Sequence, residues 1–482
     1  MISLIKVNKK LPSYLYVVML LAIITLFLTS CTLGPDYERP TLILEDSFNN
    51  EENIEKIDKK LKDIKWWKNF NDPILNILIN RANQQNLDLQ IAAKNIQFSQ
   101  EKINGLIGHL FPTVDINGAL TKTSSSLSMP QGPNTESSFT TVKTGFQTTW
   151  ELDFFGATRR GIEAENASFD AAMHQFNGVK IAIFSSVAQH YMLYQNAKIQ
   201  IQLTEKIVKN WETSLKLQND LEKSGYIAKK HSLITDSMLL QARSTLSDLR
   251  TQQKTTANQL AVLVGKKPEK LNCLLEKTPN KLPNITNEKI LSNIPSDIVF
   301  NRPDVQIAER NLAQQTALIG LQKSRLFPQF SITGNYVWQN YAAKNLLNGK
   351  NLGWNIGPFI KIPLFDFGRI QAEVDMQTTK RDISELEFTQ SVMLALQDIE
   401  KNLMYFNTHH EQAHFLYQNM INYKTIYDLT HQKYKAGLIN YVEVLDNELP
   451  YLIAAQNYYN ALTNLNLSFI NVYKALGGGY GD

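Results

Sequence analysis

The chain has 482 residues, of which 43% are hydrophobic and 20% charged, and this balance excludes a disordered or collagen-like protein. The formal net charge of +4 falls to about neutral once Lys6, Lys9 and Lys10 are set aside, so no basic surface for nucleic acid is expected. Two cysteines, Cys31 and Cys273, exclude a disulfide scaffold, and a mean hydropathy of -0.26 excludes a bundle of membrane helices.

Residues 1–30 have the layout of a secretory signal peptide. Basic residues precede an apolar run from Leu15 to Leu28, which is shorter than the roughly 20 residues of a permanent membrane helix. The run ends in Leu-Thr-Ser ahead of Cys31, which resembles the lipobox of bacterial lipoproteins, so we predict acylation of Cys31. The next residue, Thr32, is not the aspartate that retains lipoproteins in the inner membrane, which favours the outer membrane. The alternative is an uncleaved anchor followed by an incidental cysteine.

The rest of the chain contains two copies of one unit. Three landmarks of the first copy recur in the second at one constant offset in residue number, whereas a Phe-Pro pair recurs at an offset that is larger by four. The first copy therefore holds four additional residues between its Phe-Pro and Phe-Gly pairs, and we expect a turn there because loop tips tolerate insertions. The landmark pairs are Phe111-Pro112 with Phe327-Pro328, Phe155-Gly156 with Phe367-Gly368, Gly225 with Gly437, and Gly265 with Gly477.

Between the Phe-Pro and Phe-Gly pairs, apolar residues alternate with polar ones, which predicts strands. Each copy holds two such runs and a polar, turn-rich tip, and so predicts a β-hairpin. The pattern fits the strands of an outer-membrane β-barrel and equally an ordinary half-buried antiparallel sheet. The runs lie at about 114–120, 142–152, 330–338 and 354–362, with tips at 124–137 and 341–351.

A long helix follows each hairpin. Apolar residues recur at intervals of seven, as at the a and d positions of a coiled coil, and such a helix is roughly 100 Å long. After Gly225 and Gly437, a second helix of about 35 residues returns to the next glycine landmark. Shorter helices precede each Phe-Pro, with Asp72 as an N-cap and with Pro303 in a first turn. The series are Tyr194, Ile201, Val208, Leu215; then Val392, Ile399, Phe406, Ala413, Met420, Tyr427, Tyr434; and Leu396, Leu403, His410, Tyr417.

Four strands cannot close a barrel in a membrane, because the smallest barrels need about eight and lipid does not tolerate an open sheet edge. The strands must therefore be pooled between chains, and three chains would give twelve strands, enough for a closed barrel with a channel. This closure favours the barrel over the half-buried sheet.

Several motifs spread over the chain resemble the TolC and OprM-like outer-membrane efflux family, in its lipoprotein branch. The resemblance covers essentially all of the mature sequence. The motifs are Cys31 with Gly34-Pro35-Asp36-Tyr37 and Arg39-Pro40, Trp66-Trp67, Asp72-Pro73-Ile74-Leu75, Arg302-Pro303-Asp304, Ile319-Gly320 with Phe327-Pro328, Pro363-Leu364-Phe365-Asp366-Phe367-Gly368, and Gly437 with Val444-Leu445-Asp446.

The resemblance implies a mainly α fold with a β-barrel part: an internally duplicated homotrimer whose 12-stranded outer-membrane β-barrel continues into a 12-helix periplasmic α-barrel. It implies docking to a periplasmic adaptor and to an inner-membrane pump of the resistance-nodulation-division type, with passive export of drugs or other small toxic compounds and no cofactor. The expected segments are a signal peptide at 1–30, a lipid-anchored segment at 31–71, repeats at 72–266 and 302–477, a linker at 267–301 and a tail at 478–482.

The resemblance also implies which residues line the periplasmic aperture, namely Tyr434, Glu443 and Asp446. The basic partner of the tyrosine in the family falls on Ile439, so that latch contact is not expected. Three copies would bring up to six carboxylates to one constriction, which can bind cations. We hypothesise that Lys229, Lys230 and His231, just past the first-copy turn, supply counter-charges between neighbouring hairpins. The alternative for both groups is a solvated face of a helical turn.

A zinc-peptidase pattern, HExxH, occurs at His410 to His414. Because His410 falls in the heptad series and no third ligand is at hand on the same helix, we expect neither a metal site nor an enzyme. Two further alternatives stay open: the outer-membrane duct of a type I protein secretion system, and a periplasmic coiled coil without a pore.

Overall fold

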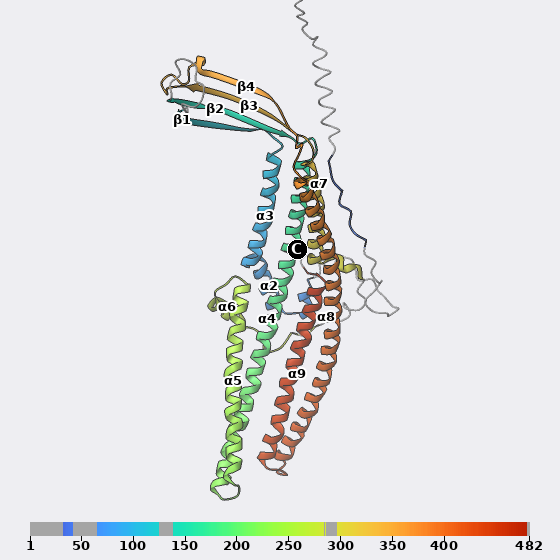
Figure 1. Cartoon of the computed structure of the whole chain (residues 1–482). Coiled ribbons are helices and arrows are strands. Elements are labelled where there is room, and N and C mark those ends of the chain that lie inside the picture. The colour runs from blue at the N-terminus through green and yellow to red at the C-terminus, as the bar shows by residue number, and fades with distance from the viewer. Residues whose placement is uncertain (1–31, 42–64, 125–137, 284, 286–295, 480–482) are drawn as a thin grey trace, which may run out of the picture. The chain divides into compact units, whose positions relative to one another are not determined.

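The computed structural model describes residues 32–41, 65–124, 138–283, 285 and 296–479. The predicted signal peptide, Cys31 and the tip of the first hairpin lie outside the described residues. The chain divides into two compact units (Figure 1). Unit 1 contains residues 97–171 and 308–387 together with the N-terminal segment up to Pro40, and unit 2 contains 41–96, 172–307 and 388–482.

The predicted helices and hairpins are confirmed, and the chain is mostly helical with one small sheet. The elements run η2 (Trp66–Phe70), α2 (Pro73–Gln85), α3 (Leu87–Gly108), β1 (Thr113–Ser124), β2 (Ser138–Leu152), α4 (Ala157–Lys223), α5 (Lys229–Leu263), α6 (Pro268–Leu275), η4 (Ser296–Asn301), α7 (Pro303–Ser324), β3 (Gln329–Asn340), η5 (Gly349–Asn351), β4 (Leu352–Lys361), α8 (Arg369–Lys435) and α9 (Tyr441–Ala475).

The element boundaries follow the internal duplication. Helices α4 and α8 each have 67 residues and α5 and α9 each have 35, and both pairs are related by the same offset as the glycine landmarks. Helices α3 and α7 each have 22 residues, strands β1 and β3 each have 12, and both pairs are related by the larger offset of the Phe-Pro pair. The four additional residues of the first copy therefore fall between β1 and β2, where a turn was predicted.

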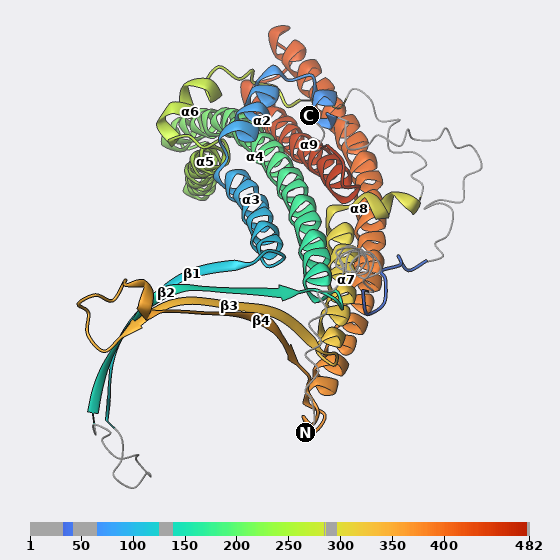
Figure 2. The same cartoon turned by 90° about the horizontal axis from the view of Figure 1, so that it is seen from above.

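The strands of unit 1 form one antiparallel sheet in the order β1-β2-β3-β4 (Figure 2). The register pairs Ile116 with Phe146, Phe146 with Tyr336, and Tyr336 with Trp354, so the apolar residues of all four strands share one face. The other face is polar, and there Asn117 donates to Gln147 and Asn335 to Asn355 across the strands. Strands β1 and β4 form the two edges of the sheet.

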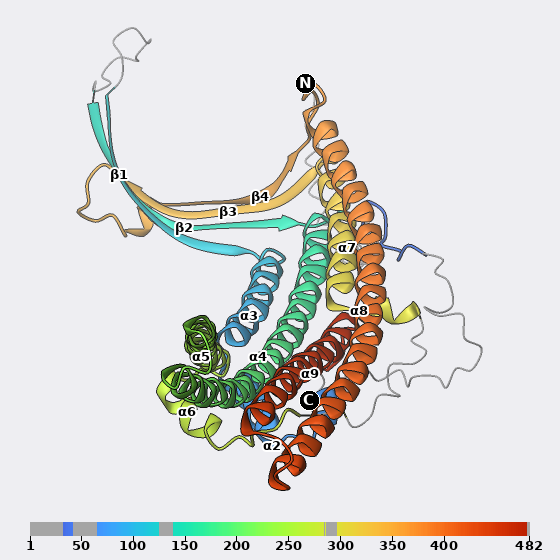
Figure 3. The ribbon, with the colours of Figure 1, turned by 90° about the horizontal axis from the view of Figure 1, so that it is seen from below.

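The helical parts of unit 1 lie side by side in the order α3, α4, α7, α8 (Figure 3). Helix α4 contacts α3 through Lys102 and Glu165, and it contacts α7 through Arg310 and Asp170. On its other side α7 contacts α8, where the amide of Gln377 donates to Gln315. Helices α3 and α8 are thus the edges of this row, as β1 and β4 are the edges of the sheet.

Unit 2 is built on two antiparallel helical hairpins, α4 with α5 and α8 with α9. Side-chain amides join α4 to α9, with Gln189 donating to Asn471 at 2.7 Å and Asn210 donating to the Leu445 carbonyl at 3.0 Å. The side chains of Ile207, Ala242 and Leu452 from α4, α5 and α9 form a buried cluster. An aromatic core closes the opposite end, where the rings of Trp66 and Tyr473, Trp67 and Phe184, and Phe70 and Phe469 pack against each other.

The helix ends have the caps that the sequence predicts. The carboxylate of Asp72 accepts hydrogen bonds from Ile74 N and Leu75 N, and the hydroxyl of Tyr191 donates to its other oxygen at 2.7 Å. At Gly225, whose φ is 78°, two backbone hydrogen bonds close a Schellman motif, and Gly437 at φ 73° ends α8 in the same way. Glycine is suited to these positions because a side chain at positive φ is strained.

The first heptad series of α8 is buried from Val392 to Ala413 and becomes more exposed toward the tip. In the second series Leu396 and Leu403 are half-buried, whereas His410 and Tyr417 are exposed in the single chain. Among the described helices, none combines the length and the apolar character that crossing a membrane requires.

Candidate functional site

The predicted aperture residues lie together at the tip of the α8–α9 hairpin. The ring of Tyr434 packs on Tyr441, with 5.2 Å between centroids. The side chain of Asn440 caps α9 by accepting a hydrogen bond from Glu443 N at 3.1 Å. Glu443 and Asp446 are one turn apart at the start of α9, and both are exposed. The cap was not predicted, although Asn-x-x-Glu before an apolar run is its signature.

The two carboxylates interact electrostatically. Partial burial and the negative charge of Glu443 raise the pKa of the Asp446 carboxyl above its ordinary value. The N-terminus of a helix carries a partial positive charge, so acidic residues such as Glu443 and Asp446 are favoured at this position. Like charges one turn apart on an exposed helix end can share a cation.

Lys229, Lys230 and His231 form the exposed first turn of α5, at the tip of the other hairpin. In the part of the chain that the structure describes, no salt bridge joins these three residues to Glu443 or Asp446. Helix α5 has Ala228 at its N-cap, with no side-chain hydrogen bond and no acidic residue in its first turn. Three basic groups at an uncapped helix start are electrostatically unfavourable within one chain.

Tyrosines pack along the seam between α8 and α9. The ring pairs Tyr417–Tyr458 and Tyr427–Tyr451 have centroid separations of 5.3 and 5.9 Å. In the other hairpin, exposed ion pairs connect the helices instead, such as Arg250 with Glu205 at 2.9 Å. The heptad series indicated Tyr417 and Tyr427 as seam residues, but the tyrosines opposite them on α9 were not predicted.

The segment that follows Cys31 is bound to unit 1. The Arg160 side chain, which is 4% exposed, donates to the Leu33 and Gly34 carbonyls and forms ion pairs with Asp36 and Glu163. Gly34 lies against Gly320 so closely that a Cβ on Gly34 would be 2.4 Å from the Gly320 Cα. The motif Gly34 to Tyr37 therefore binds to unit 1 of its own chain. Arg160 was not predicted from the sequence as the residue that binds it.

The same segment places residue 32 at the end of the sheet. Thr32 lies against Gly156, so a Cβ on Gly156 would be 2.9 Å from a Thr32 methyl carbon, and Leu33 N donates to the Phe155 carbonyl. Further along, the Tyr37 hydroxyl donates to Glu309 at 2.8 Å. Residue 32 is thus held where β2 is followed by α4.

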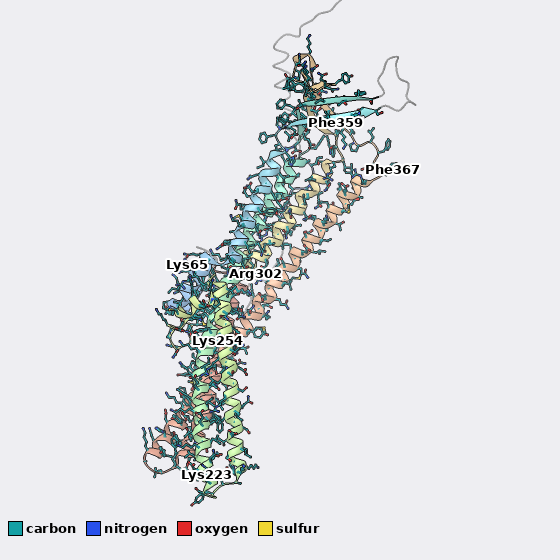
Figure 4. The ribbon with its side chains drawn as sticks, turned by 90° about the vertical axis from the view of Figure 1, so that its left-hand side faces the viewer. Lys65, Lys223, Lys254, Arg302, Phe359 and Phe367 are labelled. Carbon is teal, nitrogen blue, oxygen red and sulfur yellow. The ribbon has the colours of Figure 1, made fainter. Side chains whose placement is uncertain are left out.

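A second buried arginine, Arg302, joins three helices of unit 2 (Figure 4). Its guanidinium, which is 12% exposed, pairs with Asp304 at 2.8 Å and with Asp398 at 3.3 Å, and it donates to the Ala475 carbonyl. The hydrogen bond and charge of Arg302 hold the pKa of Asp304 below its ordinary value although burial opposes ionisation. This arrangement explains the Arg-Pro-Asp motif at the start of α7.

No group of three His, Cys, Asp or Glu side chains that could hold a metal ion occurs within the described ranges. The geometry instead presents an apolar sheet face, two free edges and a charged helical tip.

The chain belongs to the outer membrane efflux protein family, whose model matches residues 78–266 and 294–478. The solvent efflux pump outer membrane protein SrpC of Pseudomonas putida is 27% identical over 470 residues, covering 94% of this chain and 97% of SrpC. The cation efflux system protein CusC of Escherichia coli K12 is 27% identical over 463 residues, covering 95% of this chain and 98% of CusC.

Solved structures share the fold. The outer-membrane channel OprN has a TM-score of 0.79 at 24% identity, covering 93% of this chain and 100% of OprN. The Campylobacter jejuni CmeC outer membrane channel has a TM-score of 0.82 at 22% identity, covering 93% of this chain and 95% of CmeC. The fold is therefore that of TolC-like outer-membrane channels, and the predicted resemblance is confirmed.

Proposed function

We propose that this protein is the outer-membrane duct of a tripartite efflux system, which passively exports drugs or other small toxic compounds. A periplasmic adaptor and an inner-membrane pump of the resistance-nodulation-division type deliver the compounds and supply the energy. The protein is not an enzyme. The observation that carries the proposal is the four-stranded sheet with one apolar face and two free edges, on a chain of the efflux family.

The sheet also supports a homotrimer. A backbone group without a partner costs several kcal/mol in lipid, so the free edges of β1 and β4 have to be paired within the membrane. Three copies would supply twelve strands for a closed barrel in the outer membrane, and their helical hairpins would form a tunnel of twelve helices in the periplasm. One chain supplies one third of either wall.

The names of the relatives favour small molecules over secreted proteins. SrpC is named for solvent efflux and CusC for cation efflux. A deletion strain that carries the gene on a plasmid tests the proposal: the deletion should lower the inhibitory concentrations of dyes and solvents at least fourfold, and the plasmid should restore them. Loss of a secreted protein, with unchanged inhibitory concentrations, would instead indicate a type I secretion duct.

We also propose that acylated Cys31 anchors the chain in the outer membrane. The position of Thr32 against Gly156 supports this proposal, because the described segment then begins at an end of the sheet that we propose lies in the membrane.

Substitution of Cys31 by serine should abolish labelling of the protein by palmitate and block cleavage of the signal peptide before residue 31. The chain would then run larger on a denaturing gel by about 3 kDa, the mass of some 30 residues. The matched control is Cys273→Ser, since Cys273 is the exposed free cysteine of the described chain. Palmitate labelling that survives Cys31→Ser but not Cys273→Ser would contradict the anchor.

A further inference from the structure

Unit 1 contains an internal joint between the two repeats. Strand β2 of the first repeat pairs with β3 of the second so that the residue numbers of each pair add up to 482, as in Thr144 with Trp338. On the helical side, α4 of the first repeat lies against α7 of the second through Arg310 and Asp170. The joint therefore shows which strands and helices of the two repeats contact each other.

The two outer edges of unit 1, α8 with β4 and α3 with β1, are the counterparts of the elements at the joint, but no element in the described part of one chain covers them. Met376 and Ile383 on α8 are 58% and 49% exposed, whereas their counterparts on α4, Ala164 and Ala171, are 1% and 9% exposed. The counterparts are buried because α4 has α3 on one side and α7 on the other, whereas α8 is an edge of the row. On α3, at the other edge, Phe98 is 63% exposed. Both edges therefore expose apolar side chains of the kind that a protein–protein contact buries.

The turn before α8 lacks the cover that the turn before α4 has. The ring of Phe155 packs on Phe327, with 4.9 Å between centroids. Its counterpart Phe367 is 103% exposed, and Figure 4 shows it at the start of α8. The counterpart of Phe327 is Phe111, which is 63% exposed on the other edge of the unit. The chain thus carries both rings of an equivalent contact, Phe367 and Phe111, on its opposite edges, where they are exposed.

We propose that the seam between neighbouring copies repeats this internal joint residue for residue. The proposal rests on the homotrimer of the proposed function and specifies its contacts. In the other repeat, the counterpart of β2 is β4 and the counterpart of β3 is β1. Transferring the β2–β3 register to these counterparts pairs β4 of one copy with β1 of the next copy. The two residue numbers of each pair then add up to 478. Gly357 then lies opposite the partner's Thr121, and Ile360 lies opposite the partner's Gly118. In the same way Phe367 packs on the partner's Phe111.

The register is consistent with the two faces of the sheet. Even-numbered residues carry the apolar face in every strand, as Ile116, Phe146, Tyr336 and Trp354 show. Because 478 is even, the apolar face of one copy continues into the apolar face of the next. A slip by one residue would place Ile360 on the polar face of the neighbour.

The same rule specifies a contact in unit 2. Buried Asn210 of α4 donates to the Leu445 carbonyl and to Glu448 of α9. Its counterpart on α8 is Asn422, which is exposed. The corresponding acceptors are the carbonyl of the partner's Leu233 and the carboxylate of the partner's Asp236, so α8 of one copy contacts α5 of the next.

Disulfide trapping tests the register. In a Cys273→Ser background, the double variant Thr121→Cys with Gly357→Cys is oxidised in isolated outer membranes and run on a non-reducing denaturing gel. Facing residues of antiparallel strands have Cα atoms about 4.5 to 5.5 Å apart, within the range of a disulfide. Within one copy β1 and β4 are three strand spacings apart, about 14 Å, so a disulfide can form only between copies. A Cβ on Gly357 would meet nothing within 4 Å, so the substitution is tolerated.

We expect covalent dimers and trimers that disappear on reduction. Gly118→Cys with Ile360→Cys, on the apolar face, should give the same ladder and guards against a folding defect of the first variant. The matched control, Asn117→Cys with Gly357→Cys, is out of register by four residues, about 14 Å along the strand, and should stay monomeric. Each single-cysteine variant should also stay monomeric.

The outcomes separate the seam from the function. In one set of outcomes the chain forms trimers on a native gel, but only the control pair gives a ladder, or neither in-register pair gives one. Either result would overturn the register and leave the proposed duct intact. A chain that is monomeric on the native gel, with no restored drug resistance, would overturn the proposed function and the seam together.

Discussion

Replacing Arg302 by methionine is expected to lower the free energy of unfolding by about 2 to 3 kcal/mol, because the buried guanidinium hydrogen-bonds to two partly exposed carboxylates and to a backbone carbonyl. The variant keeps much of the apolar stem but leaves Asp304 without its cation, whereas Asp398 keeps Lys401 at 3.4 Å. It also leaves the Ala475 carbonyl, at the end of α9, without this donor. Guanidinium unfolding of the detergent-solubilised protein, followed by circular dichroism, measures the loss.

The control for Arg302 is an exposed arginine with a carboxylate partner. Arg243 pairs with Glu212 at 2.8 Å, and both side chains are about half exposed. Arg243→Met should therefore cost less than about 1 kcal/mol, because water screens the exposed pair. Equal losses for both variants would show that the buried pairing of Arg302 contributes nothing specific.

The pH dependence gives a second check on Arg302. The folded state lowers the pKa of Asp304, so this carboxylate stabilises the fold above its unfolded pKa, and the contribution is lost as pH falls through the lower folded value. The wild-type chain should lose this part of its stability below about pH 4, the ordinary range of an aspartate. Arg302→Met should show less of this acid dependence, because the hydrogen bond and charge of Arg302 that lower the pKa of Asp304 are gone.

Neutralising the aperture carboxylates is expected to weaken block of the channel by multivalent cations at least tenfold. In a trimer, Glu443 and Asp446 would form a ring of up to six negative charges at the hairpin tips, and such rings bind cations in pores. The double variant Glu443→Gln with Asp446→Asn retains the side-chain sizes and removes the charge. Single-channel conductance in planar lipid bilayers, with hexaamminecobalt added on the periplasmic side, measures the block.

Acid should relieve the same block in the wild-type channel. Partial burial and Glu443 raise the pKa of Asp446, so this carboxyl takes up a proton at a higher pH than an ordinary aspartate, whose pKa is about 3.9. Block should therefore weaken as pH falls toward that range, and the double variant should show no such pH dependence. Asp220→Asn, on the other hairpin, is the control. Unchanged conductance and block in Asp446→Ala trimers would disprove the acidic ring.

Much of the fold follows from local sequence patterns. Alternation of apolar and polar residues located the four strands, and glycines located the ends of the long helices, because a residue at positive φ is strained unless it is glycine. The difference between the two repeat offsets also located the longer turn. Of the candidate site, the resemblance placed Tyr434, Glu443 and Asp446, and the structure brings them to one hairpin tip. Their role in the aperture remains a proposal.

The sequence by itself determined the types and approximate ranges of the strands and long helices and the duplication, since each depends on residues close together in the chain or on repeated motifs. Only the tertiary structure decided which distant residues meet: Arg160 with Leu33 and Asp36, Arg302 with Asp398 and Ala475, and Asn210 with Leu445. Arginine, aspartate and asparagine recur throughout the chain, and no local pattern distinguishes the pairs. The pairing depends on how the long helices pack, because packing alone brings groups 96 or more residues apart in the chain within hydrogen-bond distance.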